Sequence, residues 1–107
     1  MSTHWASHAI EQLSLGNVCT VTPHGNSMQP RIQSGATVTL APVTAPLQVN
    51  DAVLVKVHGT VYLHLIKAIR GTGDNMQYQI GSARGSINGW TGKQNVYGIV
   101  THIEQPK

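Results

Sequence analysis

The stretch AVLVKVHGTVYLHLIKAI, residues 52–69, contains two apolar runs that flank His58-Gly59. Both runs are rich in Val, Leu and Ile, and β-branched residues are typical of strands. A two-residue connection that contains Gly is typical of the tight turn of a β-hairpin. The stretch therefore predicts a hairpin made of residues 52–57 and 60–69.

Shorter runs of the same kind lie on both sides of this hairpin, separated by turn-like segments rich in Gly, Pro, Asn and Asp. The Gly-rich segment 81–95 is predicted as a long loop, and the final EQPK as a frayed end. We expect a mostly β domain over residues 18–103, a barrel-type fold of six or seven strands. The strands predicted beyond the hairpin are VCTVTP (18–23), TVTLAPV (37–43), MQYQIG (76–81) and VYGIVTHI (96–103).

The segment before the predicted sheet has the pattern of a short amphipathic helix over residues 3–14. Ser2 or Thr3 is placed to cap its start, and Gly16-Asn17 is placed to end it. We expect this helix to lie against the sheet through apolar residues that recur at helical spacing: Trp5, Ala9, Ile10 and Leu13.

Composition limits the classes of protein to which the chain belongs. Its 107 residues, 40% hydrophobic and 10% charged, fit a single domain, residues 1–107. The net charge of +3 is too small and scattered for the basic face of a nucleic-acid-binding protein. Without an apolar run of about 18 residues or a signal-peptide pattern, we expect a cytoplasmic protein with no membrane partner. Cys19 is the only cysteine, which excludes an intramolecular disulfide and a Cys-rich zinc site, and we expect neither metal nor cofactor.

The segment GNSMQP, residues 25–30, places one serine in a tight turn. Gly25 permits an unusual backbone angle or the close approach of a substrate chain, and Met28 is suited to anchor the loop while Ser27 points outward. A backbone N–H of this turn is a candidate oxyanion donor. A serine in a Gly-Asn turn is, however, most often a turn residue only.

A nucleophilic Ser27 needs a base, and the strand 60–69 offers two. Alternation places His64 on the face of Tyr62, Ile66 and Ala68, and Lys67 on the opposite face with Ile69. His64 is the better candidate because imidazole titrates near neutrality, whereas Lys67 needs a strongly lowered pKa. The alternative is a core histidine that is hydrogen-bonded to backbone.

The order of these segments resembles the serine peptidases of the LexA-repressor and type I signal-peptidase fold, over about residues 18–103. The first matching box is GNSMQP itself, where the family has Gly-x-Ser-Met-x-Pro. Ala36 stands after Gly35 where the family has an aspartate. The remaining matches are Asn50-Asp51-Ala52-Val53, the strand that carries His64, and Tyr97-Gly98-Ile99-Val100.

The resemblance implies a LexA/signal-peptidase-like fold in which Ser27 is the nucleophile and His64 takes the position of the general base. Most of the family has lysine there, and the branch with histidine uses a Ser-His pair with an aspartate that orients the ring. The corresponding box here, Gly81-Ser82-Ala83-Arg84, has no aspartate. Ser82, Asn88 and Asp74 remain as alternatives for the third group, with Ser82 taken as the catalytic candidate.

The Gly-rich segment also suggests substrate contacts. Arg84 and Trp90 are candidates for a substrate-facing rim, alongside Gly25 and Met28 of the Ser27 loop. The alternatives are a Trp90 that packs on the sheet and an Arg84 that binds a phosphate or carboxylate.

The function expected from these residues is a serine peptidase-like domain that cleaves a polypeptide through a Ser-His dyad. The resemblance implies an extended substrate with small residues next to the cleavage point. The alternative is a catalytically inactive interaction or dimerisation module of phage or repressor type, in which Ser27 and His64 are too far apart to hydrogen-bond. The expected partners are thus a polypeptide substrate or a protein, including a second copy of the chain.

Overall fold

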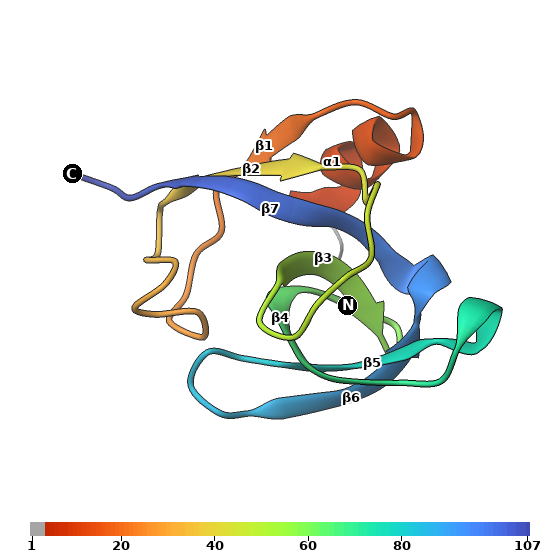
Figure 1. Ribbon diagram of the computed structural model, residues 1–107. Coiled ribbons are helices and arrows are strands. Elements are labelled where there is room, and N and C mark those ends of the chain that lie inside the picture. Colours follow the sequence, from red (N-terminus) through yellow and green to blue (C-terminus); the bar gives the residue numbers. More distant parts are fainter. Residues whose placement is uncertain (1–3) are drawn as a thin grey trace.

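The computed structural model describes residues 4–107, in which one α-helix is followed by seven strands (Figure 1). The helix α1 covers His4–Ser14, so the predicted capping residues Ser2 and Thr3 lie outside the described residues. The strands are β1 (Cys19–Val21), β2 (Thr37–Ala41), β3 (Ala52–Val57), β4 (Thr60–Arg70), β5 (Gln77–Gly81), β6 (Ile87–Gly92) and β7 (Val96–Glu104), with 3-10 helices η1 (Gly73–Asn75) and η2 (Lys93–Asn95). None of the helices in residues 4–107 is long and apolar enough to cross a membrane.

The predicted hairpin is confirmed and lies at the centre of the sheet. β3 and β4 pair antiparallel from Ala52 opposite Leu65 to Val57 opposite Thr60. The turn has positive φ angles at His58 (48°) and Gly59 (83°), as a type I′ turn requires. The hairpin therefore provides the rigid platform on which the candidate base, on β4, is held.

All seven strands form one antiparallel sheet in the order β1-β2-β7-β3-β4-β5-β6. Figure 1 shows α1 beside β1 and β2 at one end of this sheet, and β5 and β6 at the other. The expected barrel-type closure is wrong, because β1 and β6 are the two ends of the strand order in the described chain. Closure requires the edge strands to pair in register, whereas β1 has only three residues and packs beside α1.

The segment 81–95 is not the long loop that the sequence predicts. Residues 87–92 form β6, which pairs with β5 from Gln77 opposite Gly92 to Gly81 opposite Ile87. The Gly-rich sequence has little apolar alternation, and its strand conformation comes from the hydrogen-bonding partner that β5 supplies. The remaining connection between β5 and β6 is a tight turn.

Apolar side chains are buried on both faces of the central strands. β3 supplies Leu54 to one cluster and Val53 and Val55 to the other, which explains its uninterrupted apolar run. The first cluster also takes Ala6, Ala9 and Leu13 from α1, and Val61, Leu63 and Leu65 from β4. Trp5 lies off this buried helix face and is 44% exposed, contrary to the predicted amphipathic pattern.

The alternation of β4 holds up to Ile66 and then shifts. A bulge leaves Lys67 without a partner between the pairs Ile66–Ile80 and Ala68–Gln79. Ile69 therefore packs in the same apolar cluster as Ile66, and the predicted placement of Ile69 on the opposite face is wrong. The extra residue of a bulge changes the phase of every residue that follows it.

The chain end is also more ordered than predicted, and it touches the Ser27 loop. Glu104 belongs to β7, and the side chain of Gln105 accepts a hydrogen bond from the backbone N–H of Gln33 (3.0 Å). The same side chain donates to the carbonyl of Arg31 (2.8 Å). These two bonds fix Gln105 to the loop, so the prediction of a frayed end is wrong at this residue.

Candidate active site

The loop that carries Ser27 runs between β1 and β2 and is closed on itself by backbone contacts. The N–H of Gly35 donates to the carbonyl of Pro23 (2.9 Å), and the N–H of Gly25 donates to Oγ of Ser34 (3.0 Å). Met28 is 5% exposed and packs in the first apolar cluster, as the sequence predicts. The anchored Met28 leaves its neighbour Ser27 exposed at the surface of the loop.

Two other segments hold the loop in place from outside. The N–H of Ala83, in the β5–β6 turn, donates to the carbonyl of Ser27 (2.9 Å). The guanidinium of Arg31 donates to the carbonyl of Asn50, just before β3. Together with Gln105, these contacts tie the Ser27 loop to the β5–β6 turn, to the start of β3 and to the end of β7.

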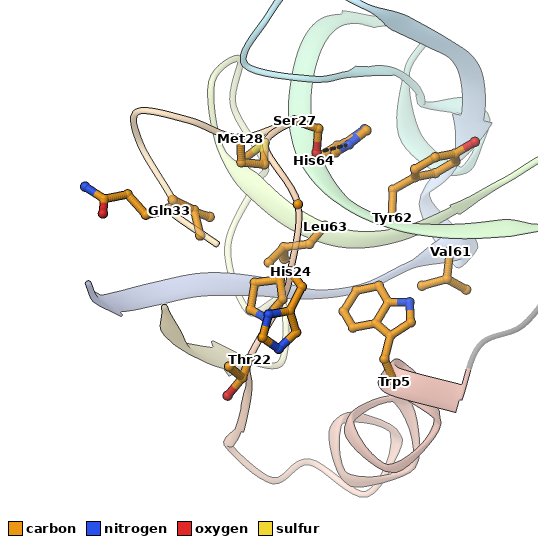
Figure 2. A pocket seen from close by; sticks show the side chains of 13 residues that line it. Trp5, Thr22, His24, Ser27, Met28, Gln33, Val61, Tyr62, Leu63 and His64 are labelled. Carbon is orange, nitrogen blue, oxygen red and sulfur yellow. Dashed lines mark hydrogen bonds between the residues drawn. The ribbon is translucent and has the colours of Figure 1, made fainter. Parts of the chain in front are cut away.

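The side chains of Ser27 and His64 meet in one hydrogen bond, drawn as a dashed line in Figure 2. Nε2 of His64 lies 3.1 Å from Oγ of Ser27. The imidazole is only 8% exposed and stacks on the ring of Tyr62, with 4.8 Å between ring centroids. This contact contradicts the separation that the inactive-module alternative expects.

The other ring nitrogen of His64 contacts Asn88. Nδ1 lies 2.7 Å from Oδ1 of Asn88. A carbonyl oxygen only accepts, so Nδ1 carries the proton and donates it to Asn88. In the neutral ring Nε2 then has a free lone pair, which accepts the hydrogen bond from the Ser27 hydroxyl.

The surroundings keep this imidazole in its neutral form. Burial lowers the pKa of His64 below its ordinary value, and the positive charge of Lys67 lowers it further, while the hydrogen bond with Asn88 acts in the opposite direction. The net shift is downward. A neutral imidazole at pH 7 is what a base that takes the Ser27 proton requires.

A second bulge brings Asn88 to the ring. In the β5–β6 ladder Ile80 pairs with Gly89 and Gly81 pairs with Ile87, so Asn88 is the residue without a partner. Gly89 has a φ angle of 136°, a conformation open mainly to glycine. Bulges near active sites re-aim a side chain, and here the re-aimed side chain is the amide that contacts His64.

The structure places the other two alternatives for the third group differently. The Ser82 hydroxyl accepts from the N–H groups of Arg84 (3.2 Å) and Ser86 (3.0 Å), so it organises the β5–β6 turn. No hydrogen bond of the described residues joins it to Ser27 or His64. Asp74 lies in η1 and is exposed, with its carboxylate 3.8 Å from Nζ of Lys93.

A pocket of about 370 Å³ opens beside Ser27 and His64 (Figure 2). Gly25 and Met28, two of the residues predicted to contact substrate, line it. Arg84 and Trp90 are not among its lining residues. Arg84 is exposed in the β5–β6 turn, and Trp90 is covered by the guanidinium of Arg70, 4.0 Å from the ring centroid.

Sequence reasoning missed the contribution of Trp5 and Tyr62 to this pocket. The alternation of β4 already placed Tyr62 on the face of His64, so that signal was present. The placement of Trp5 depends on how α1 is rotated against the sheet, which the helical spacing alone does not determine.

Comparisons of the chain with models of known protein families, with curated proteins and with solved structures found no match. Among residues 4–107, no group of three or more His, Cys, Asp or Glu side chains is arranged to hold a metal ion. The site itself consists of a hydroxyl, an imidazole and an amide in one hydrogen-bonded row.

Proposed function

We propose that this protein is a serine peptidase-like hydrolase that cleaves a polypeptide through Ser27 and His64, with Asn88 orienting the imidazole. The observation that carries the proposal is the continuous row of hydrogen bonds from the Ser27 hydroxyl through both ring nitrogens to Asn88. A hydroxyl becomes an effective nucleophile when an adjacent base removes its proton and a third group orients that base. An amide serves as the orienting group in papain-like peptidases, which supports this role for Asn88.

In the first half of the proposed reaction, Oγ of Ser27 attacks the scissile carbonyl carbon while its proton moves to Nε2 of His64. The tetrahedral intermediate collapses as the C–N bond breaks, and the imidazolium gives its proton to the departing amine. The acyl group is then bonded to Oγ of Ser27.

In the second half, water attacks the acyl carbon and gives one proton to Nε2 of His64. The C–O bond to Ser27 breaks, the carboxylic acid leaves, and the proton returns to Oγ. The Nδ1–H bond to Asn88 stabilises the imidazolium that forms in each half.

The turn also offers a donor for the negative charge that develops on the carbonyl oxygen. The backbone N–H of Ser27 takes part in no hydrogen bond within the described part of the chain. The buried Met28 side chain and the hydrogen bond from the Ala83 N–H to the Ser27 carbonyl (2.9 Å) hold this turn in place. A preorganised N–H of this kind is the usual donor of an oxyanion hole.

Labelling with a fluorophosphonate, followed by mass spectrometric mapping between pH 6 and 9, tests the proposal. We expect modification at Ser27, lost in Ser27→Ala and slowed by about 10² to 10⁴ in His64→Ala. Ser14→Ala is the matched control, because Ser14 is an exposed serine at the end of α1, bonded to the carbonyl of Glu11. Cleavage of a peptide library by the wild type, absent in Ser27→Ala, tests the polypeptide substrate.

Absence of labelling at every pH in this range would overturn the proposal and favour the interaction module. Labelling at an unchanged rate in His64→Ala would show that His64 does not act as the base.

A further inference from the structure

The pocket beside the dyad is bounded by two different parts of the chain. One wall is the segment 22–25 that leads to Ser27, and the other is the start of β4 from Val61 to His64. Figure 2 shows Ser27 and His64 at one end of the space between these walls and Trp5 at the other. The pocket is therefore continuous with the reacting atoms, and Trp5 of α1 bounds its far end.

The lining of this pocket is mostly apolar, with a smaller polar share from residues such as Thr22, His24 and Gln33. None of its thirteen residues is Asp, Glu, Lys or Arg. Buried side chains of the first apolar cluster form its base: Met28, Ile32, Val61 and Leu63. Such a lining offers no carboxylate, ammonium or guanidinium to pair with a charged side chain, whose desolvation would be poorly compensated.

The volume is large for the small residue that the family resemblance implies. An apolar cavity of about 150 Å³ holds a benzene molecule, and this pocket measures about 370 Å³. A methyl group would leave most of that space to water. An aromatic or long aliphatic side chain occupies far more of it than a methyl group does and covers more apolar surface.

Trp5 contributes exposed apolar surface to this pocket. The side chain is 44% exposed although its helix buries Ala6, Ala9 and Leu13 against the sheet. A tryptophan face at the rim of an apolar pocket gives a large contact area for an apolar ligand. Its position at the far end makes it the wall that limits the length of the bound side chain.

We propose that this pocket binds a large apolar side chain, aromatic or leucine-like, on the acyl side of the bond that Ser27 attacks, and that Trp5 determines this specificity. The inference rests on the proposed function, because it assigns the pocket to the substrate of that same dyad. Acyl-side residues stay attached to Ser27 in the acyl-enzyme, so their side chains lie nearest to a pocket lined by Ser27 and Gly25. Apolar pockets discriminate by about 10- to 200-fold for each methylene of difference.

The test uses N-acylated α-amino diphenyl phosphonates with the side chains of Ala, Leu and Phe. Oγ of Ser27 forms a bond to phosphorus, a P–O bond breaks, and phenol leaves with the hydroxyl proton, so all three report on the same step. We expect Phe and Leu reagents to inactivate the wild type at least about 10-fold faster than the Ala reagent. Trp5→Ala lowers the Phe-to-Ala rate ratio toward one.

Leu15→Ala is the matched control, since Leu15 follows the same helix, is 68% exposed and does not line the pocket. This variant keeps the wild-type ratio. If the Ala reagent inactivates the wild type as fast as the Phe reagent while the fluorophosphonate still labels Ser27, the pocket inference is overturned. The proposed role of Ser27 and His64 is then unaffected. A wild type that resists the fluorophosphonate itself overturns the proposed function, and the pocket inference with it.

Discussion

The side chains of His64 and Asn88 are joined by a 2.7 Å contact although their strands, β4 and β6, are separated by β5 in the sheet. The bulge at Asn88 changes the phase of β6 at this point and so the face to which the amide points. The amide therefore reaches the imidazole from a strand that is not its neighbour, and it is the group that fixes the proton on Nδ1.

Removing the amide tests this orienting role. In Asn88→Ala, Nδ1 of His64 loses its acceptor, so the tautomer and the direction of Nε2 are no longer fixed. We expect the rate of Ser27 modification to fall by about 100-fold, at the lower end of what acid–base catalysis supplies. The rate constant for fluorophosphonate labelling at pH 8 measures this loss.

Asn88→Asp is the conservative comparison. A carboxylate at this position still accepts from Nδ1, so labelling at pH 8 is retained. Its negative charge also favours the imidazolium, which raises the pKa of His64. Equal rates for wild type and Asn88→Ala would contradict the orienting role.

The dependence of labelling on pH follows from the lowered pKa of His64. Only the neutral imidazole accepts the Ser27 proton, so the rate falls as pH drops through the pKa of the folded protein. Burial and the nearby Lys67 charge place that pKa below the ordinary histidine value of about 6.5. We expect the midpoint of the acidic limb below that value in a rate profile measured from pH 4.5 to 9.

Lys67→Met changes this midpoint in a defined direction. Loss of a nearby positive charge favours protonation of His64, so the midpoint moves to higher pH. Lys93→Met is the control, because Lys93 lies beside Asp74 and contributes nothing to the shift at His64. A midpoint that stays in place or moves to lower pH in Lys67→Met would show that the lysine charge does not act on the ring.

The sequence was sufficient where structure depends on neighbours along the chain. The hairpin 52–69 follows from its apolar runs and the His58-Gly59 turn, and the face of His64 follows from regular alternation up to Ile66. The family resemblance is what pairs His64 with Ser27, and the local rules place His64 on its face of the strand. They do not require knowledge of which strand lies beside β4.

The sequence was insufficient where structure depends on register between strands. β6 forms because β5 supplies its hydrogen-bonding partners. Which of Ser82, Asn88 and Asp74 contacts His64 depends on where the β5–β6 pairing has its bulge. Close packing of Leu13 on Gly98 holds α1 against β7, and an added Cβ at Gly98 would lie 2.7 Å from that leucine. This packing determines how α1 is rotated about its axis against the sheet. The rotation directs Trp5 to the pocket, and no spacing in residues 4–14 reveals it.

Gln105 provides a third prediction, since it links the chain end to the Ser27 loop. Gln105→Ala removes two hydrogen bonds, one to Gln33 and one to Arg31, each worth about 0.5–1.5 kcal/mol. We expect the free energy of unfolding in urea to fall by about 1–3 kcal/mol. Because the loop is loosened, labelling of Ser27 slows roughly fivefold, the factor that corresponds to about 1 kcal/mol.

Gln105→Glu separates the two bonds. A carboxylate still accepts from the N–H of Gln33 but no longer donates to the carbonyl of Arg31, so an intermediate loss is expected. If Gln105→Ala unfolds at the same urea concentration as the wild type, the chain end does not support the loop.

The backbone at Gly25 leads to a fourth prediction, in which conformation and steric contact are separable. Gly25 has a φ angle of 120°, and a Cβ added there would have no heavy atom of another segment within 4 Å. The cost of Gly25→Ala is therefore backbone strain, about 1–3 kcal/mol, rather than a clash. The strain is relieved by moving the segment that carries Ser27, so labelling slows along with the loss of stability in urea.

Gly73→Ala is the matched control for this strain. Gly73 has a φ angle of 54° and equally open surroundings, and it lies in η1, which does not line the pocket beside Ser27. Left-handed strain at this position costs about 1–2 kcal/mol, without displacing Ser27, so the labelling rate stays at the wild-type value. If both variants label Ser27 at the wild-type rate, the conformation at Gly25 is not what sets the nucleophile in place, and Met28 together with the Ala83 contact must position it alone.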